Sequence, residues 1–115
     1  MVHVKFELRL FSLDELSEKA QEKAIEEHRR FMLDTMTPED YISGDPEYDT
    51  PEALRECYES EYDYICSCDD PVVESIEINE YLFFENGELA NVCRYYGGPN
   101  RGKTILHFMG RDIEI

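Results

Sequence analysis

The chain has no long apolar run, which limits the classes of protein to which it can belong. Its 115 residues include no stretch close to the ~20 apolar residues that a membrane-spanning helix needs. The opening MVHVKFELRL places polar residues at alternate positions and has no apolar segment typical of a secretory signal. We therefore expect a cytoplasmic protein that does not bind membranes and whose four cysteines are free thiols.

The sequence also lacks the spacing of common metal sites. Cys66 and Cys68 form one C-x-C pair, without the second closely spaced pair that structural zinc sites show. Asp45, Glu47 and Asp49 alternate as ligands of a hard cation can, but the glycine and glutamate of an EF-hand loop are missing. We expect no metal and no cofactor.

A catalytic constellation is missing as well. The histidines at positions 3, 28 and 107 fall on separate predicted elements, and several hydroxyl residues stand at predicted helix starts, where they act as caps. Carboxylates are so numerous that no two of them mark an acid and base pair. We therefore assign no catalytic residues and predict that the protein is not an enzyme.

One named motif is present, and its surroundings argue against it. Residues 97–104, GGPNRGKT, fit the G-x-x-x-x-G-K-[ST] pattern of a phosphate-binding loop. Such a loop needs a strand before it and a helix after it, because the helix N-terminus holds the phosphates. The following ILHFMGRDIEI has the pattern of strands rather than of a helix. We therefore predict a turn between two antiparallel strands.

The rest of the pattern predicts one α+β domain, residues 1–115, with helices packed on an antiparallel sheet of about three to five strands. Alternation over 2–10 predicts a first strand, and helical spacing over 11–33 predicts a helix whose start is uncertain between two serines. Thr-Pro-Glu at 37–39 predicts a short helical turn, and the same tripeptide at 50–52 predicts a second long helix. Residues 72–96 and 104–115 predict strands, with a hairpin turn at Asn86-Gly87. The predicted order is β-α-(α)-α-β-β-β.

Basic residues are almost missing from the middle of the chain. The net charge is −16, and residues 31–93 alone carry 18 acids against one base, Arg55. Such a field repels nucleic acid and membranes and attracts basic surfaces, which are typical of proteins that bind DNA or RNA. Tyrosines are interleaved with these acids, and tyrosine supplies rigid contact area at interfaces.

Two interpretations of the acidic segment stay open: a solvated surface, or a binding surface for a basic partner. For the second, the candidate partner-binding residues are Asp45, Glu47, Asp49, Glu52, Glu56, Glu59, Glu61, Asp63, Asp69 and Asp70.

Two stretches resemble segments of small phage and prophage proteins. FSLDELSEKAQEKAIEEHRRF is similar to their "aromatic-x-ELS-E-A-x-x-KA" helix, and Asn79, Tyr81, Phe83 or Phe84, and Gly87 are similar to their "N-x-Y-x-F-x-x-x-G" hairpin. The resemblance covers about half of the chain and implies the cytoplasm of a phage-infected or lysogenic bacterium. It carries no functional residue over, because most members of that group have no assigned activity.

In that context the resemblance implies an inhibitor of host defence, of the anti-CRISPR or anti-restriction kind. The hypothesis is a non-enzymatic protein whose carboxylates stand where phosphates would and occupy the basic nucleic-acid groove of a CRISPR effector or another defence nuclease. This hypothesis predicts that the protein itself does not bind nucleic acid. The alternative is a phage accessory or antitoxin-like module that binds a protein partner without mimicry.

Overall fold

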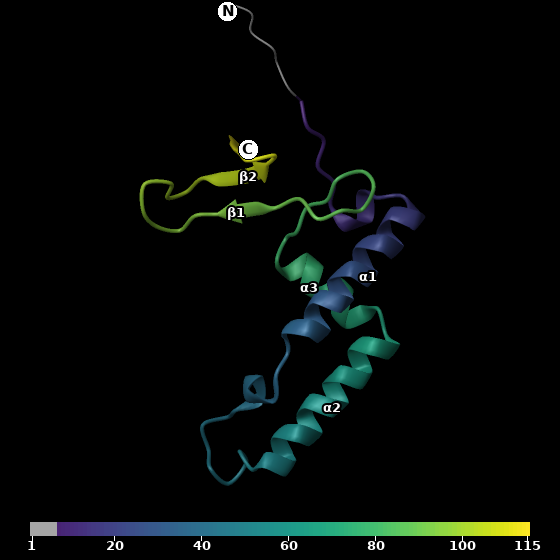
Figure 1. Ribbon diagram of the computed structural model, residues 1–115, viewed down its shortest axis with the longest axis vertical. Coiled ribbons are helices and arrows are strands. Elements are labelled where there is room, and N and C mark those ends of the chain that lie inside the picture. The colour runs from purple at the N-terminus through teal and green to yellow at the C-terminus, as the bar shows by residue number, and fades with distance from the viewer. Residues whose placement is uncertain (1–6) are drawn as a thin grey trace, which may run out of the picture. The chain divides into compact units, whose positions relative to one another are not determined.

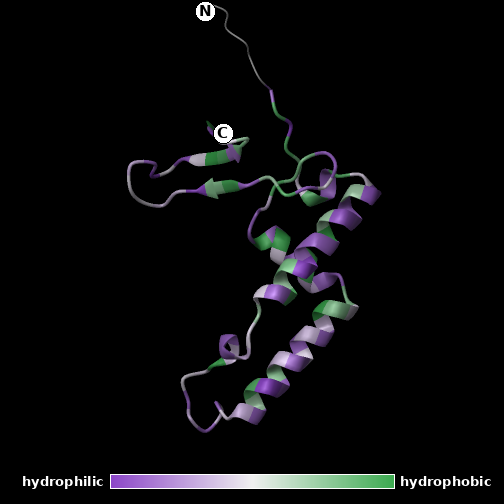
Figure 2. Cartoon of the chain, viewed as in Figure 1, coloured by the Kyte–Doolittle hydropathy of each residue, from purple (hydrophilic) through white to green (hydrophobic). Residues whose placement is uncertain are grey.

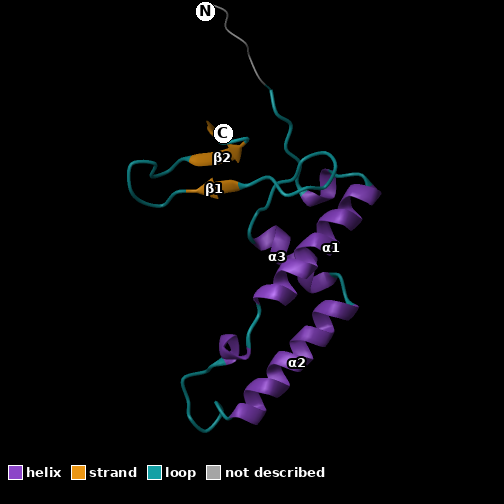
Figure 3. Ribbon diagram, viewed as in Figure 1, coloured by secondary structure: helices purple, strands orange, loops and turns teal. Residues whose placement is uncertain are grey.

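The computed structural model describes residues 7–115 and confirms the α+β class (Figure 1). Three α-helices precede a three-stranded antiparallel sheet with strand order β1-β2-β3 (Figure 3). The helices are α1 (Glu18–Thr35), α2 (Pro51–Ser67) and α3 (Asp70–Ile78), and the strands are β1 (Val92–Arg94), β2 (Thr104–Phe108) and β3 (Arg111–Glu114). Two short 3₁₀ helices, η1 (Leu13–Glu15) and η2 (Pro38–Tyr41), complete the fold.

The chain divides into two compact units, and the boundary falls within α1. Unit 1 joins the residues up to Ala24 to Asn79–Ile115, and unit 2 is Ile25–Ile78. All ten candidate partner-binding residues belong to unit 2. The assignment of residues 1–115 to one domain stays a prediction.

The N-terminal strand is not seen. Its first part, up to residue 6, lies outside the described residues, and residues 7–10 form no strand. Instead Phe11 makes an isolated antiparallel bridge with Phe83, through two N–H···O bonds of 2.8 Å. Alternation of apolar residues indicates which face a strand would bury, but it does not supply a partner strand.

Both serines proposed as helix starts are used. Ser12 and Glu15 form the expected capping box on η1, where the backbone N–H of Ser12 donates to Glu15 Oε1 at 2.9 Å. Ser17 Oγ accepts from the backbone N–H of Ala20 at 3.3 Å and caps α1. A 3₁₀ turn therefore separates the two caps, and α1 begins one turn later than Ser12 suggests.

Gly87 lets the predicted hairpin turn approach α1 closely within unit 1. Phe83 and Leu89 pair in an antiparallel bridge across Asn86-Gly87, which confirms the turn. Gly87 has φ +93°, and a Cβ built there would lie 2.4 Å from the carbonyl oxygen of Ala20. Only glycine fits both the left-handed conformation and the close contact. Lys23 and Glu88 form an ion pair of 3.4 Å beside it.

The phosphate-loop motif is a connection between antiparallel strands, as predicted. Residues 95–103 join β1 to β2, and the backbone N–H of Tyr95 donates to the carbonyl oxygen of Lys103 within this connection at 3.0 Å. The segment after Thr104 is β2 and β3, joined at Met109-Gly110, where both residues have positive φ. No helix follows the motif, so the geometry that a phosphate-binding loop requires is not built.

The strands predicted over 72–96 are wrong over the first part, because Asp70–Ile78 is a helix, and residues 79–91 form only isolated bridges at Phe83 and Leu89 before β1. The β-branched residues of α3 favour a strand. However, Val72 and Ile76 stand four residues apart and are 0% and 1% exposed, which is the spacing of one buried helix face. Pro71 in the first turn is also typical of a helix start.

Arg29 and His28 fasten the helices of unit 2 to one another. Arg29 Nε donates to the carbonyl oxygen of Ile65 at 2.9 Å, and its guanidinium pairs with Glu26 and Asp69. His28 is buried, with its Nε2 2.9 Å from Ser75 Oγ on α3. Burial lowers the pKa of His28. Both residues therefore serve packing within this unit.

Candidate partner-binding surface

The long helix α2 begins where the sequence predicts. Thr50 Oγ1 accepts from the backbone N–H of Ala53 at 3.2 Å, and Pro51 takes the first helical position. At the other end, the carbonyl oxygens of Ile65 and Cys68 accept hydrogen bonds from Arg29. Hydrogen bonds therefore fix both ends of α2, the helix that carries the exposed acids.

Four of the ten candidate acids form a single line on that face, which we call the acidic row: Glu52, Glu56, Glu59 and Asp63. All four are exposed, and their spacing of four, three and four residues keeps them on one side of the helix. At 1.5 Å per residue the row is about 16 Å long. Figure 2 shows the hydrophilic residues recurring along α2.

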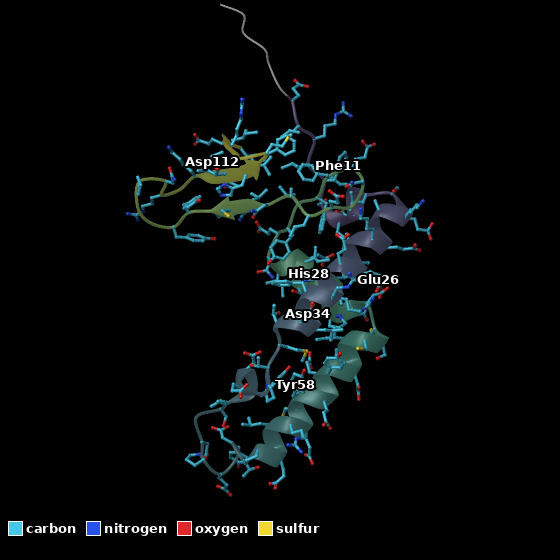
Figure 4. The ribbon with its side chains drawn as sticks, in the orientation of Figure 1. Phe11, Glu26, His28, Asp34, Tyr58 and Asp112 are labelled. Carbon is cyan, nitrogen blue, oxygen red and sulfur yellow. The ribbon has the colours of Figure 1, made fainter. Side chains whose placement is uncertain are left out.

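Beside the acidic row, two tyrosines border a shallow hollow of about 390 Å³ that is open to solvent. Its lining is Tyr58, Glu59, Tyr62 and Asp63, which we call the tyrosine hollow. The ring centroids of Tyr58 and Tyr62 lie 5.9 Å apart, and the two ring planes are tilted by 42° relative to each other. Tyr58 projects from α2 in Figure 4, and Tyr62 is 37% exposed.

Glu61 is not part of the acidic row. It is half-buried on the opposite side of α2, the side that packs against η2. Burial, and then the charge of Glu61, raise the pKa of Tyr41 on η2. Glu61 therefore faces an internal contact of unit 2 rather than a partner.

The three acids of the connector are held in different ways. Asp49 accepts hydrogen bonds from the backbone N–H and the hydroxyl of Ser43, both at 2.8 Å, and from Gly44 N–H at 2.9 Å. These bonds lower the pKa of Asp49. Asp45 accepts from Glu47 N–H at 3.0 Å, whereas the Glu47 side chain is exposed. The carboxylates of Asp45 and Asp49 therefore stabilise the conformation of the loop.

The last two candidates, Asp69 and Asp70, begin α3. Asp69 is paired with Arg29, so its charge is already compensated within the chain. Its backbone carbonyl accepts from Val72 and Val73, which starts the helix. Asp70 is exposed in the first turn, where a carboxylate interacts favourably with the helix dipole. The base count of residues 31–93 does not include this partner, because Arg29 precedes that segment on α1.

The charge excess belongs to unit 2. By sequence, Ile25–Ile78 carries 17 acids and three bases, a net charge of −14, whereas the remainder carries 10 acids and eight bases, a net charge of −2. Of the three bases, Arg29 is engaged with Glu26 and Asp69. Arg55 stands on α2 itself, yet it forms no ion pair with any carboxylate in the described part of the chain. The acidic row is therefore not neutralised from within.

The cysteines and histidines of residues 7–115 do not form a cluster at this surface. Cys66 is exposed and Cys68 half-buried, and both are free thiols. Within residues 7–115 no group of three or more His, Cys, Asp or Glu side chains is arranged to hold a metal ion. The same residues include no helix that combines the length and the apolar content needed to cross a membrane.

Comparisons of the chain with known protein families, curated proteins and solved structures found no match. The similarity to small phage proteins therefore stays a prediction.

Proposed function

We propose that this protein is a non-enzymatic, phage-derived inhibitor that binds the basic nucleic-acid groove of a host defence nuclease through the acidic row of α2. The observation that supports the proposal is the row itself: four exposed carboxylates on one helix face that form no ion pair within residues 7–115. A groove that binds phosphates presents arginine and lysine, which complement such a row.

The row occupies the groove by charge complementarity, so that nucleic acid is excluded. Its four carboxylates stand about 4.5–6 Å apart along the helix axis, whereas phosphates of one DNA strand advance about 3.4 Å per nucleotide. A single row of carboxylates can pair with one line of arginine and lysine side chains in the groove. It does not reproduce the two phosphate strands of a duplex. Association therefore weakens steeply as salt is added.

The test uses bacterial proteins retained on immobilised duplex DNA at low salt. The full chain is applied as eluant, and the displaced proteins are identified by mass spectrometry. We expect displacement of one or a few proteins, and loss of that activity in the triple variant Glu52→Lys, Glu56→Lys, Glu59→Lys. Polyglutamate of equal charge, applied in parallel, shows which proteins any polyanion removes.

The matched control reverses three exposed acids of α1: Glu18→Lys, Glu22→Lys and Glu27→Lys. It changes the net charge by the same amount but leaves the acidic row intact, so we expect displacement to persist. Equal behaviour of the two triple variants, or no displacement by the unaltered chain, would contradict the proposal.

A second candidate function is a protein-binding module without mimicry. The tyrosine hollow favours it, because rigid aromatic area beside charge is typical of protein interfaces. The two functions differ in competition: a mimic and duplex DNA exclude each other from the partner, whereas a module of the second kind stays bound when DNA is added.

A further inference from the structure

We propose that the tyrosine hollow receives an arginine side chain of the partner and discriminates it from lysine. This inference rests on the proposed function, since it names the chemistry that the same face of α2 recognises. It commits to a protein segment that presents arginine, rather than to a second copy of this chain.

Two side-by-side pairs of residues make up the hollow. Tyr58 and Tyr62 are four residues apart, as are Glu59 and Asp63, so an aromatic pair and a carboxylate pair run next to each other along α2. The tyrosine rings are 5.9 Å apart. A group that fits both pairs has to be flat, positively charged and able to donate several hydrogen bonds.

Guanidinium meets all three requirements. It stacks on aromatic faces and at the same time donates to a carboxylate through its planar fork. The lysine ammonium is compact and strongly hydrated, and it has no plane to lay against a ring. The aromatic pair therefore separates the two cations, whereas the carboxylate pair attracts both.

Nothing in the described chain supplies that guanidinium. Arg55 precedes Glu59 by four residues, within reach along the helix, but it makes no ion pair with Glu59 or Asp63 among the described residues. The volume of about 390 Å³ lies at the small end of ligand pockets, and the hollow is open. It suits a single side chain presented from outside.

The experiment compares two labelled peptides, octa-arginine and octa-lysine, by fluorescence anisotropy with the full chain at low salt. We expect octa-arginine to bind about tenfold more tightly, since each exposed cation–π contact contributes a few-fold. In the double variant Tyr58→Leu, Tyr62→Leu the two peptides should bind equally.

The matched control, Tyr48→Leu with Tyr64→Leu, removes two exposed tyrosines outside the hollow and should keep the tenfold preference. Equal binding of both peptides to the unaltered chain would overturn the inference and leave the proposed function standing. Failure of both peptides to bind at low salt would overturn both. A preference that survives loss of Tyr58 and Tyr62 would also overturn the inference.

Discussion

Removing one charge from the acidic row should make the protein more stable. Glu56 has two like-charged neighbours on the same face, Glu52 four residues before it and Glu59 three residues after it. Each such pair destabilises a helix by about 0.2–0.5 kcal/mol. Glu56→Gln removes both repulsions, so we expect the free energy of unfolding to rise by about 0.4–1 kcal/mol at low salt.

Urea unfolding followed by far-ultraviolet circular dichroism measures this change, because the chain has no tryptophan to serve as a probe. Urea carries no charge and leaves the ionic strength free to vary. In 1 M salt the screening length falls to about 3 Å, so the gain should nearly vanish.

Glu27→Gln provides the matched control, because Glu27 is exposed on α1 between two cations, Lys23 four residues before and Arg30 three residues after. Here a carboxylate with opposite-charged neighbours is lost, so stability should fall by a few tenths of a kcal/mol. A loss of stability in Glu56→Gln, or a gain that persists in 1 M salt, would refute the electrostatic description of the acidic row.

The remaining predictions concern the internal contacts. Gly87→Ala forces a side chain against the Ala20 carbonyl at positive φ, and thermal unfolding should show a loss of about 2–4 kcal/mol. Arg29→Ala removes a guanidinium that hydrogen-bonds to two carbonyls and pairs with two carboxylates; urea unfolding should show a loss of about 2–3 kcal/mol, and none would contradict its role. Because burial lowers the pKa of His28 below its ordinary 6.5, the unfolded state takes up the proton first as pH falls. Stability should therefore be full above pH 6.5 and decline below it, and His28→Gln should abolish that decline in pH-dependent denaturation.

Much of the fold follows from local signals that the sequence displays. The caps at Ser12, Ser17 and Thr50 and the turn at Asn86-Gly87 depend on neighbours within a few residues, and the structure contains all four. The missing strand at residues 7–10 depends on a partner far along the chain, which local alternation does not reveal.

The helix α3 was mispredicted for a different reason. Its β-branched residues favour a strand by propensity, but burial of Val72 and Ile76 on one helical face outweighs a preference of at most about 1 kcal/mol. Where propensity and burial disagree, the buried spacing decides.

For the candidate acids, too, properties set by nearby residues could be predicted, whereas contacts with residues far along the chain could not. Exposure of Glu52, Glu56 and Glu59 follows from helical periodicity, so the acidic row could be predicted once the helix was. The pairing of Asp69 with Arg29 could not, because 40 residues separate the two partners. Distant contacts therefore decide which acids remain available to a partner.

The composition of the outer face of α2 supports the proposed binding function over a merely solvated surface. The ends of α2 are held by Thr50 and Arg29, neither of which uses the acidic row. A helix face that only has to be soluble can alternate acids with lysines. Opposite charges three or four residues apart stabilise a helix, whereas like charges at the same spacing destabilise it. Glu52 interacts favourably with the helix dipole in the first turn, but the like-charged pairs along the acidic row lower the stability of α2. Under the proposed function a basic partner removes that repulsion on binding, so in Glu56→Gln stability should rise while affinity for octa-arginine falls.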